Sequence, residues 1–90
     1  MTPKRSRQQI MLAILDLCTG DGANKTQIVY KCNLNFQTVR GYLDELQKAG
    51  LIEAIRQPHH HRKTKTGDIY RTTQRGITAA GMLRGSELVE

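Results

Sequence analysis

The sequence predicts an α+β fold in which three helices precede a β-hairpin and a last helix follows it. Three observations support this prediction. Residues 35–49 place apolar side chains at the spacing of an amphipathic helix, and residues 51–57 and 69–73 alternate as strands do. The segment 58–68 between those strands is rich in turn-forming and basic residues. With 90 residues, the chain is expected to form one domain, 1–90, around a modest core.

The first predicted helix spans residues 6–19. One apolar stripe follows it at helical spacing: Ile10, Ala13, Ile14, Leu17 and Cys18. Met11, Leu12 and Leu15 extend the apolar surface beyond the width that one core contact needs. We therefore expect the C-terminal segment or a second subunit to cover part of this helix.

The second predicted helix spans residues 26–33, with Thr26 as its N-cap. It is expected to bury Ile28, Val29 and Cys32, and residues 33–35 form a tight turn after it. A short helix and a tight turn before a longer helix are typical of a helix-turn-helix, which many proteins use to read duplex DNA.

The third predicted helix spans residues 35–49, with Asn35 as N-cap and Gly50 as the residue that ends it. Its apolar face consists of Phe36, Val39, Tyr42, Leu43, Leu46 and Ala49. The opposite face is polar and carries Gln37, Arg40, Gly41, Asp44 and Lys48. A small three-helix protein that never contacts DNA could show the same amphipathic pattern, so the helices alone leave both interpretations open.

The predicted hairpin, residues 51–73, changes that balance because its tip is basic. No carboxylate occurs between Ala54 and Gly67. The cations of this segment are Arg56, Arg62, Lys63 and Lys65, and His59, His60 and His61 add charge when they are protonated. A hairpin that follows such a helix forms a wing, so the expected fold is a winged helix-turn-helix with a three-helix core, a two-stranded β-wing and a C-terminal helix.

The candidate DNA contacts fall into two groups. Asn35, Gln37, Thr38, Arg40 and Gly41 lie at the start of the third helix, where base edges would be reached, and Arg40 suits guanine because it can donate two parallel hydrogen bonds. The candidates for phosphate are Lys31, Lys48, His60, Arg62, Lys63 and Lys65. Asp44 and Glu45 would repel phosphates, so only the first half of the helix is expected to enter a groove deeply. For Arg40, a solvated helix position remains an alternative.

The charge of the chain favours a polyanionic partner without choosing one. The net charge is +6 and the sequence pI is near 9.8, which suits DNA, RNA or an acidic protein. Aromatic residues are few: Tyr30, Phe36, Tyr42 and Tyr70. Because Phe36 and Tyr42 are assigned to the core, an RNA-binding platform of exposed aromatic rings is disfavoured.

Several other classes of protein lack support in the sequence. No apolar run is long enough to span a bilayer and no signal peptide is evident, so we expect a cytoplasmic, nucleoid-associated protein. Cys18 and Cys32 lie at apolar positions and are expected to be free thiols. The run His59–His61 has no cysteine nearby to complete a metal site. We expect no catalytic constellation, no cofactor, no metal and no small-molecule effector.

A last helix is predicted over residues 74–89, capped by Thr73. Its apolar residues are Ile77, Ala80, Met82, Leu83 and Leu88, and Gly76, Gly81 and Gly85 weaken it. We expect a homodimer formed by the first and last helices through Met11, Leu15, Met82 and Leu83. The alternative is that the last helix folds back over its own domain.

The sequence resembles small archaeal winged helix-turn-helix regulators of the ArnR-like kind. The resemblance rests on residues 22–53, GANKTQIVYKCNLNFQTVRGYLDELQKAGLIE, and on the later pattern of Tyr70, Thr73 and Gly76. It implies a helical N-terminal segment, a helix-turn-helix, a wing and a C-terminal helix, with dimeric DNA binding in transcription or chromatin. The C-terminal helix is shorter and richer in glycine than in several relatives, and the wing is long and rich in histidine.

Three functions are therefore compatible with the sequence. The first is a dimeric, DNA-binding transcriptional regulator. The second is a winged helix that binds an acidic protein; weak DNA affinity without base preference would favour this function. The third is an architectural chromatin protein that coats duplex DNA almost regardless of sequence.

Overall fold

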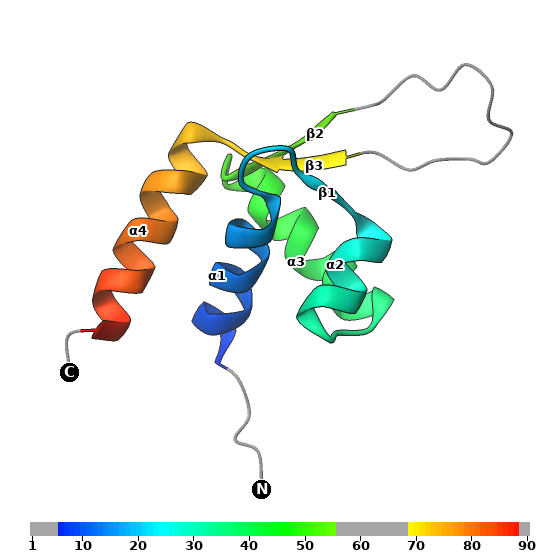
Figure 1. Cartoon of the computed structure of the whole chain (residues 1–90), viewed down its shortest axis with the longest axis horizontal. Helices are drawn as coiled ribbons and strands as arrows, with labels where there is room; N and C mark the ends of the chain where they lie inside the picture. The colour runs from blue at the N-terminus through cyan, green and yellow to red at the C-terminus, as the bar shows by residue number, and fades with distance from the viewer. Residues whose placement is uncertain (1–5, 56–68, 89–90) are drawn as a thin grey trace, which may run out of the picture.

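The computed structural model describes residues 6–55 and 69–88, with side chains described as far as Gly85. The described ranges contain four helices and three short strands (Figure 1). In chain order these are α1 (Arg7–Cys18), β1 (Ala23–Asn24), α2 (Lys25–Cys32), α3 (Phe36–Lys48), β2 (Ile52–Ile55), β3 (Ile69–Thr72) and α4 (Gln74–Leu88). The predicted α+β fold class is confirmed.

The sheet has one more strand than the sequence predicted. Its order is β1-β3-β2, and both pairings are antiparallel. Ala23 lies opposite Tyr70, and Ile52 lies opposite Thr72. The predicted pair of wing strands corresponds to β2 and β3. The sequence did not reveal β1 because this strand, only two residues long, is too short to show the alternation that marks a strand. This strand ties the start of α2 to the hairpin.

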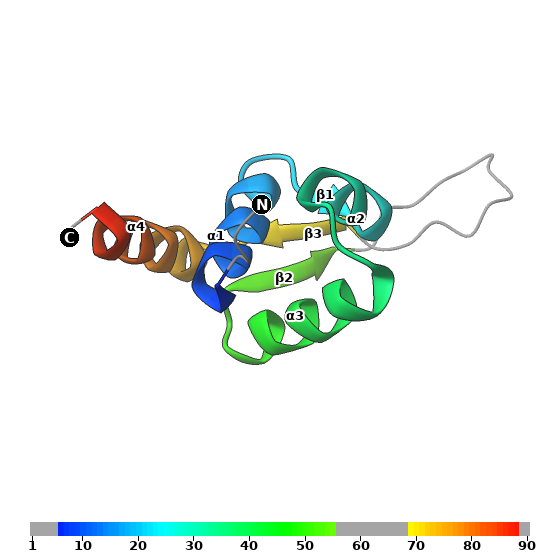
Figure 2. The same ribbon diagram turned by 90° about the horizontal axis from the view of Figure 1, so that it is seen from below.

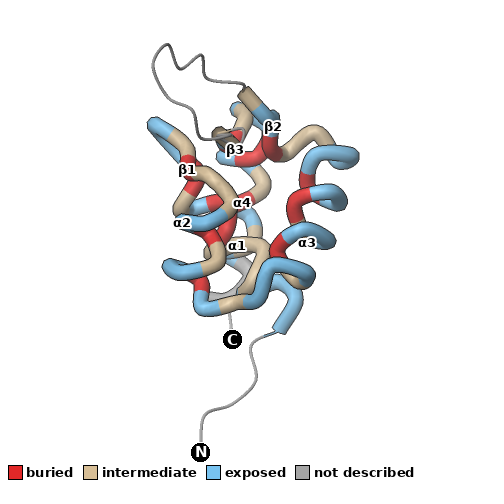
Figure 3. Tube along the Cα trace, turned by 90° about the vertical axis from the view of Figure 1, so that its right-hand side faces the viewer, coloured by how far each residue is buried: buried red, intermediate tan, exposed pale blue. Residues whose placement is uncertain are grey.

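The core lies where α1, α2 and α3 meet beneath the sheet, and each helix turns its buried side inward (Figure 3). Ile14, Leu15, Ile28, Val39 and Leu46 have no exposed surface. Burying a side chain of this size contributes about 1.5–3 kcal/mol. The α3 helix is therefore held firmly along one side, while its other side faces outward.

Two apolar residues lie elsewhere than the sequence suggested. Phe36, assigned to the core, is 54% exposed although its spacing places it on the same side of α3 as Val39 and Leu43, because it is the first residue of the helix and lies at the very end of the buried stripe. Leu15, proposed as a dimer contact, is fully buried in the core of its own domain. A fully buried side chain cannot contact a second subunit, so the proposal was wrong for Leu15.

Side chains fix the starts of the helices. The N-cap of α2 is Asn24 rather than the predicted Thr26, and the Asn24 side chain accepts a hydrogen bond from the Gln27 backbone at 2.8 Å. For α3 the predicted N-cap is confirmed, since the Asn35 side chain accepts from the Thr38 backbone at 2.7 Å. Gly50 follows α3 with a φ of 78°, the left-handed conformation expected for a residue that ends a helix.

The α4 helix starts against the sheet and runs beside α1, at the end of the molecule away from α2 (Figures 1 and 2). Thr73 caps it as predicted, accepting from the Gly76 backbone at 3.1 Å. A Cβ on Gly76 would lie 2.1 Å from the Leu51 carbonyl oxygen, so only glycine fits this contact. Gly76 therefore permits α4 to approach the sheet closely.

The end of α1 is joined to the sheet by a buried hydrogen bond. The Thr72 hydroxyl donates to the Leu15 carbonyl oxygen at 2.7 Å, and the Thr19 hydroxyl donates to the same oxygen at 2.7 Å. These bonds satisfy a carbonyl near the helix end, where intrahelical partners run out.

Among the described residues, none of the helices is both long and apolar enough to cross a membrane.

Candidate nucleic-acid interface

The outward side of α3 is polar and open. Val39, Leu43 and Leu46 are buried, so Gln37, Arg40, Gly41 and Asp44 lie on the opposite, exposed side of the helix. A Cβ on Gly41 would meet no atom within 4 Å, so no neighbouring group in the described structure requires glycine there. An interior glycine costs a helix roughly 0.5–1 kcal/mol relative to alanine. At the centre of its exposed side, α3 therefore presents backbone without a side chain, and this glycine lowers the stability of the helix.

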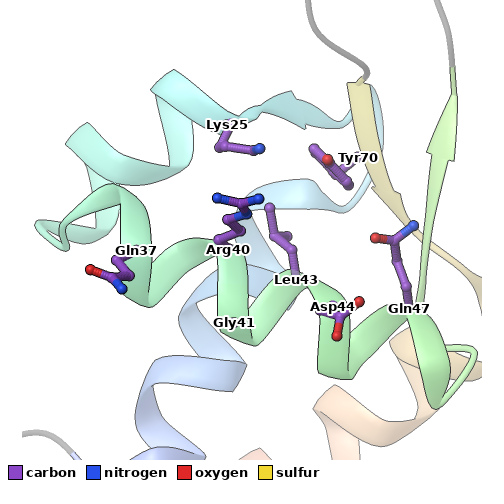
Figure 4. Close-up of a pocket in the computed structure, with 8 residues that line it drawn as sticks. All are labelled: Lys25, Gln37, Arg40, Gly41, Leu43, Asp44, Gln47 and Tyr70. Carbon is purple, nitrogen blue, oxygen red and sulfur yellow. The ribbon is translucent and has the colours of Figure 1, made fainter.

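A groove of about 630 Å³ lies between α3, the start of α2 and β3 (Figure 4). We call it the α3 groove. Its lining consists of Lys25, Gln37, Arg40, Gly41, Leu43, Asp44, Gln47 and Tyr70. In Figure 4 the side chains of Lys25 and Arg40 both extend into the space between the two helices, whereas Gln37 points outward from the start of α3.

The charges along α3 are divided between its two halves. In the second half, Lys48 lies 3.5 Å from the Asp44 carboxylate, and Arg7 of α1 pairs with Glu45. Within the described part of the chain, neither Lys25 nor Arg40 forms an ion pair. The carboxylates of the second half are therefore neutralised locally, whereas Arg40 in the first half and Lys25 at the start of α2 are two neighbouring cations without an ion-pair partner among the described residues.

This fold and this face can be compared with known proteins. A family model described as winged helix-turn-helix matches residues 4–88, which is nearly the whole chain. The chain belongs to the winged helix-turn-helix family. No match was found among curated proteins.

Two solved structures are similar to this winged helix. A MarR family transcription regulator is 31% identical with a TM-score of 0.71, over 90% of this chain and 50% of that protein. The transcriptional repressor CouR, bound to a 23-mer DNA duplex, is 23% identical with a TM-score of 0.67, over 91% of this chain and 54% of that one. At that identity the likeness to CouR shows the fold alone. The winged helix spans about half the length of each of these proteins.

Lys25 and Tyr70 are residues of the winged-helix face that the sequence did not reveal. Lys25 reaches the groove because Asn24, with Gln27, caps α2 and because β1 pairs with β3 just before it. Tyr70 lies on β3, opposite Ala23. Helical periodicity within residues 35–49 could not identify side chains contributed by other elements. Only the pairing of β1 with β3, which is not evident in the sequence, places them beside Arg40.

The other predicted DNA contacts do not all lie at the α3 groove. Thr38 is half-buried, and the Asn35 side-chain oxygen is used for capping. Lys31 is exposed in the last turn of α2 and does not line the α3 groove. The four wing contacts lie outside the described residues: His60, Arg62, Lys63 and Lys65. The candidate face is thus defined by the first half of α3 and the start of α2.

The cysteines take no part in this face. Cys18 and Cys32 are buried free thiols. Burial, and after it the charge of the nearby Cys32, raise the pKa of Cys18 from 9.0 to about 12. Such a thiol stays protonated near neutral pH and is a poor nucleophile. Among the described residues, no group of three His, Cys, Asp or Glu could hold a metal ion.

Proposed function

We propose that this protein is a DNA-binding transcriptional regulator that inserts α3 into the major groove, with its hairpin on the flanking phosphates. The observation that carries the proposal is the pair of cations, Lys25 and Arg40, in an open groove beside the polar side of α3. Two positive groups held on separate elements are suited to a polyanion that passes between them. The major groove is wide enough to admit one α-helix.

The roles within α3 follow from exposure. Arg40 can donate two hydrogen bonds to guanine, and Gln37 can pair with adenine. Gly41 allows the helix backbone to approach the DNA closely, since it carries no side chain at the centre of the exposed side. The similarity to a MarR family transcription regulator, and the shared fold with CouR, which was solved bound to a DNA duplex, support duplex DNA as the partner. The ArnR-like resemblance further favours an archaeal, cytoplasmic and nucleoid-associated regulator.

A homodimer formed through α1 and α4 is part of the proposal. Met82 is 69% exposed and Ile77 is 44% exposed on α4, while Met11 and Leu83 are half-buried. Large apolar side chains gain free energy when a second subunit covers them. The α4 helix lies at the end of the molecule away from α2, so such contacts leave the α3 groove accessible. Two copies of α3 could then read two half-sites.

Fluorescence anisotropy tests the proposal directly. Binding to a sequence selected from a randomised duplex library is compared with binding to an unselected duplex at several salt concentrations. Preference for the selected site, with affinity falling steeply as salt rises, is the expected result. Equal affinity for both duplexes would indicate an architectural protein. No binding at low salt would refute DNA binding and favour an acidic protein as partner.

Three alanine variants locate the contact on the protein. Lys25→Ala should flatten the salt dependence by about 0.9 in the slope of log K against log salt, the value for one phosphate contact. Lys48→Ala should have a smaller effect because Asp44 already pairs with that lysine. Arg40→Ala should cost about 1–3 kcal/mol and relax the preference at one base pair. Unchanged affinity and preference in Arg40→Ala would show that the α3 groove is not the interface.

A further inference from the structure

Phe36 is a large aromatic residue whose position the core does not explain. It is 54% exposed at the first position of α3, although Val39 and Leu43 of the same helix are buried. Scattered exposed apolar residues are ordinary on protein surfaces. Phe36, however, lines a hollow of about 300 Å³ with Lys25, Gln37 and Arg40. An apolar ring therefore forms part of a hollow whose other lining groups are cationic or polar.

The composition of this hollow fits one feature of duplex DNA. A ligand that satisfies it must combine negative charge, hydrogen-bonding edges and a small apolar group. The major groove offers phosphates, base edges and one apolar group, the C5-methyl of thymine. Phenylalanine is among the side chains that contact that methyl group. The first residues of the second helix of a helix-turn-helix are also the ones that reach base edges.

We infer that Phe36 is a specificity-determining residue that contacts the C5-methyl group of a thymine in the DNA site. This inference rests on the proposed function and adds a base preference to it. Phe36 and Arg40 are four residues apart on α3, which separates them by about 6 Å along the helix axis. Base pairs repeat every ~3.4 Å, so the thymine lies within about two base pairs of the position that Arg40 reads.

The test removes only the methyl group. In the selected duplex, each thymine is replaced singly by deoxyuridine, which keeps every hydrogen bond and lacks the C5-methyl group. At one thymine per half-site, we expect the wild-type protein to lose about fourfold in affinity, the value that corresponds to burial of one carbon group. Phe36→Ala should bind both duplexes equally at that position. The reference for each substitution is the unmodified duplex, in which that position carries thymidine, that is, 5-methyldeoxyuridine.

Tyr30→Ala is the matched control variant. Tyr30 is 78% exposed on α2 and does not line the hollow, so its removal should preserve the fourfold discrimination. Because Phe36 is largely exposed, Phe36→Ala should fold, and its melting temperature checks this. The inference is overturned if no thymine methyl group matters, or if Phe36→Ala retains the discrimination. Either result leaves DNA binding itself intact, whereas a wild-type protein that binds no duplex would refute both proposals.

Discussion

Replacing Gly41 by alanine should raise stability and lower DNA affinity together. The added Cβ meets nothing within 4 Å, so no steric penalty opposes the better helix propensity of alanine. The expected gain is about 0.5–1 kcal/mol, or roughly 2–8 °C in melting temperature for a domain of this size. At a closely docked surface, an extra methyl group costs about 1–3 kcal/mol, which corresponds to at least about a fivefold loss of affinity.

The matched control is Gly81→Ala in α4. Gly81 also lies inside a helix, and a Cβ there likewise meets nothing within 4 Å. It should therefore give a similar gain in thermal stability without the loss in DNA affinity. Melting curves, fluorescence anisotropy and sedimentation velocity on both variants separate stability, binding and assembly. If Gly41→Ala were less stable than wild type, or bound DNA as tightly, our account of the exposed side of α3 would be refuted.

Three further predictions concern the core, the thiols and the subunit interface. Thr72→Val removes the donor to the Leu15 carbonyl oxygen and should lower the free energy of unfolding by about 0.5–1.5 kcal/mol in urea titrations. The raised pKa of Cys18 favours the neutral thiol in the folded state, so its contribution to stability is present below pH 9.0 and is lost as the pH rises towards about 12. Melting temperatures of Cys18→Ala should accordingly decline less steeply across that range, and an equal decline would contradict this assignment. Met82→Glu should reduce the dimer fraction in sedimentation velocity while leaving the monomer fold unchanged, because Met82 is 69% exposed; an unaltered dimer would exclude Met82 from the interface.

The fold class could be predicted because its signals are local. The buried stripe of α3 repeats at 3.6 residues, and its start and end are marked by Asn35 and Gly50. Thr73 likewise marks the start of α4. A cap and a stop act within a few residues of their position, so the sequence shows them without knowledge of the tertiary structure.

The burial of individual apolar side chains on the helices could not be predicted in the same way. Phe36 and Leu15 are both apolar, yet one is largely exposed and the other is fully buried. The difference depends on which neighbouring element covers each side of a helix, and periodicity alone does not identify that element. Gly76 illustrates the same point, because its close contact with the Leu51 carbonyl oxygen exists only after α4 has packed on the sheet.

The strand β1 explains how distant residues form one candidate face. It pairs with β3 immediately before α2 begins, so the position of Lys25 is coupled to that of Tyr70. The same β3 strand pairs with β2, which follows α3 after Gly50. A shift of the hairpin strands would therefore move the start of α2 relative to α3 and change the spacing of Lys25 and Arg40. Phosphate contact and base contact both depend on that spacing. The sheet therefore sets the geometry of the α3 groove, although Tyr70 is the only residue of the described strands that lines the groove.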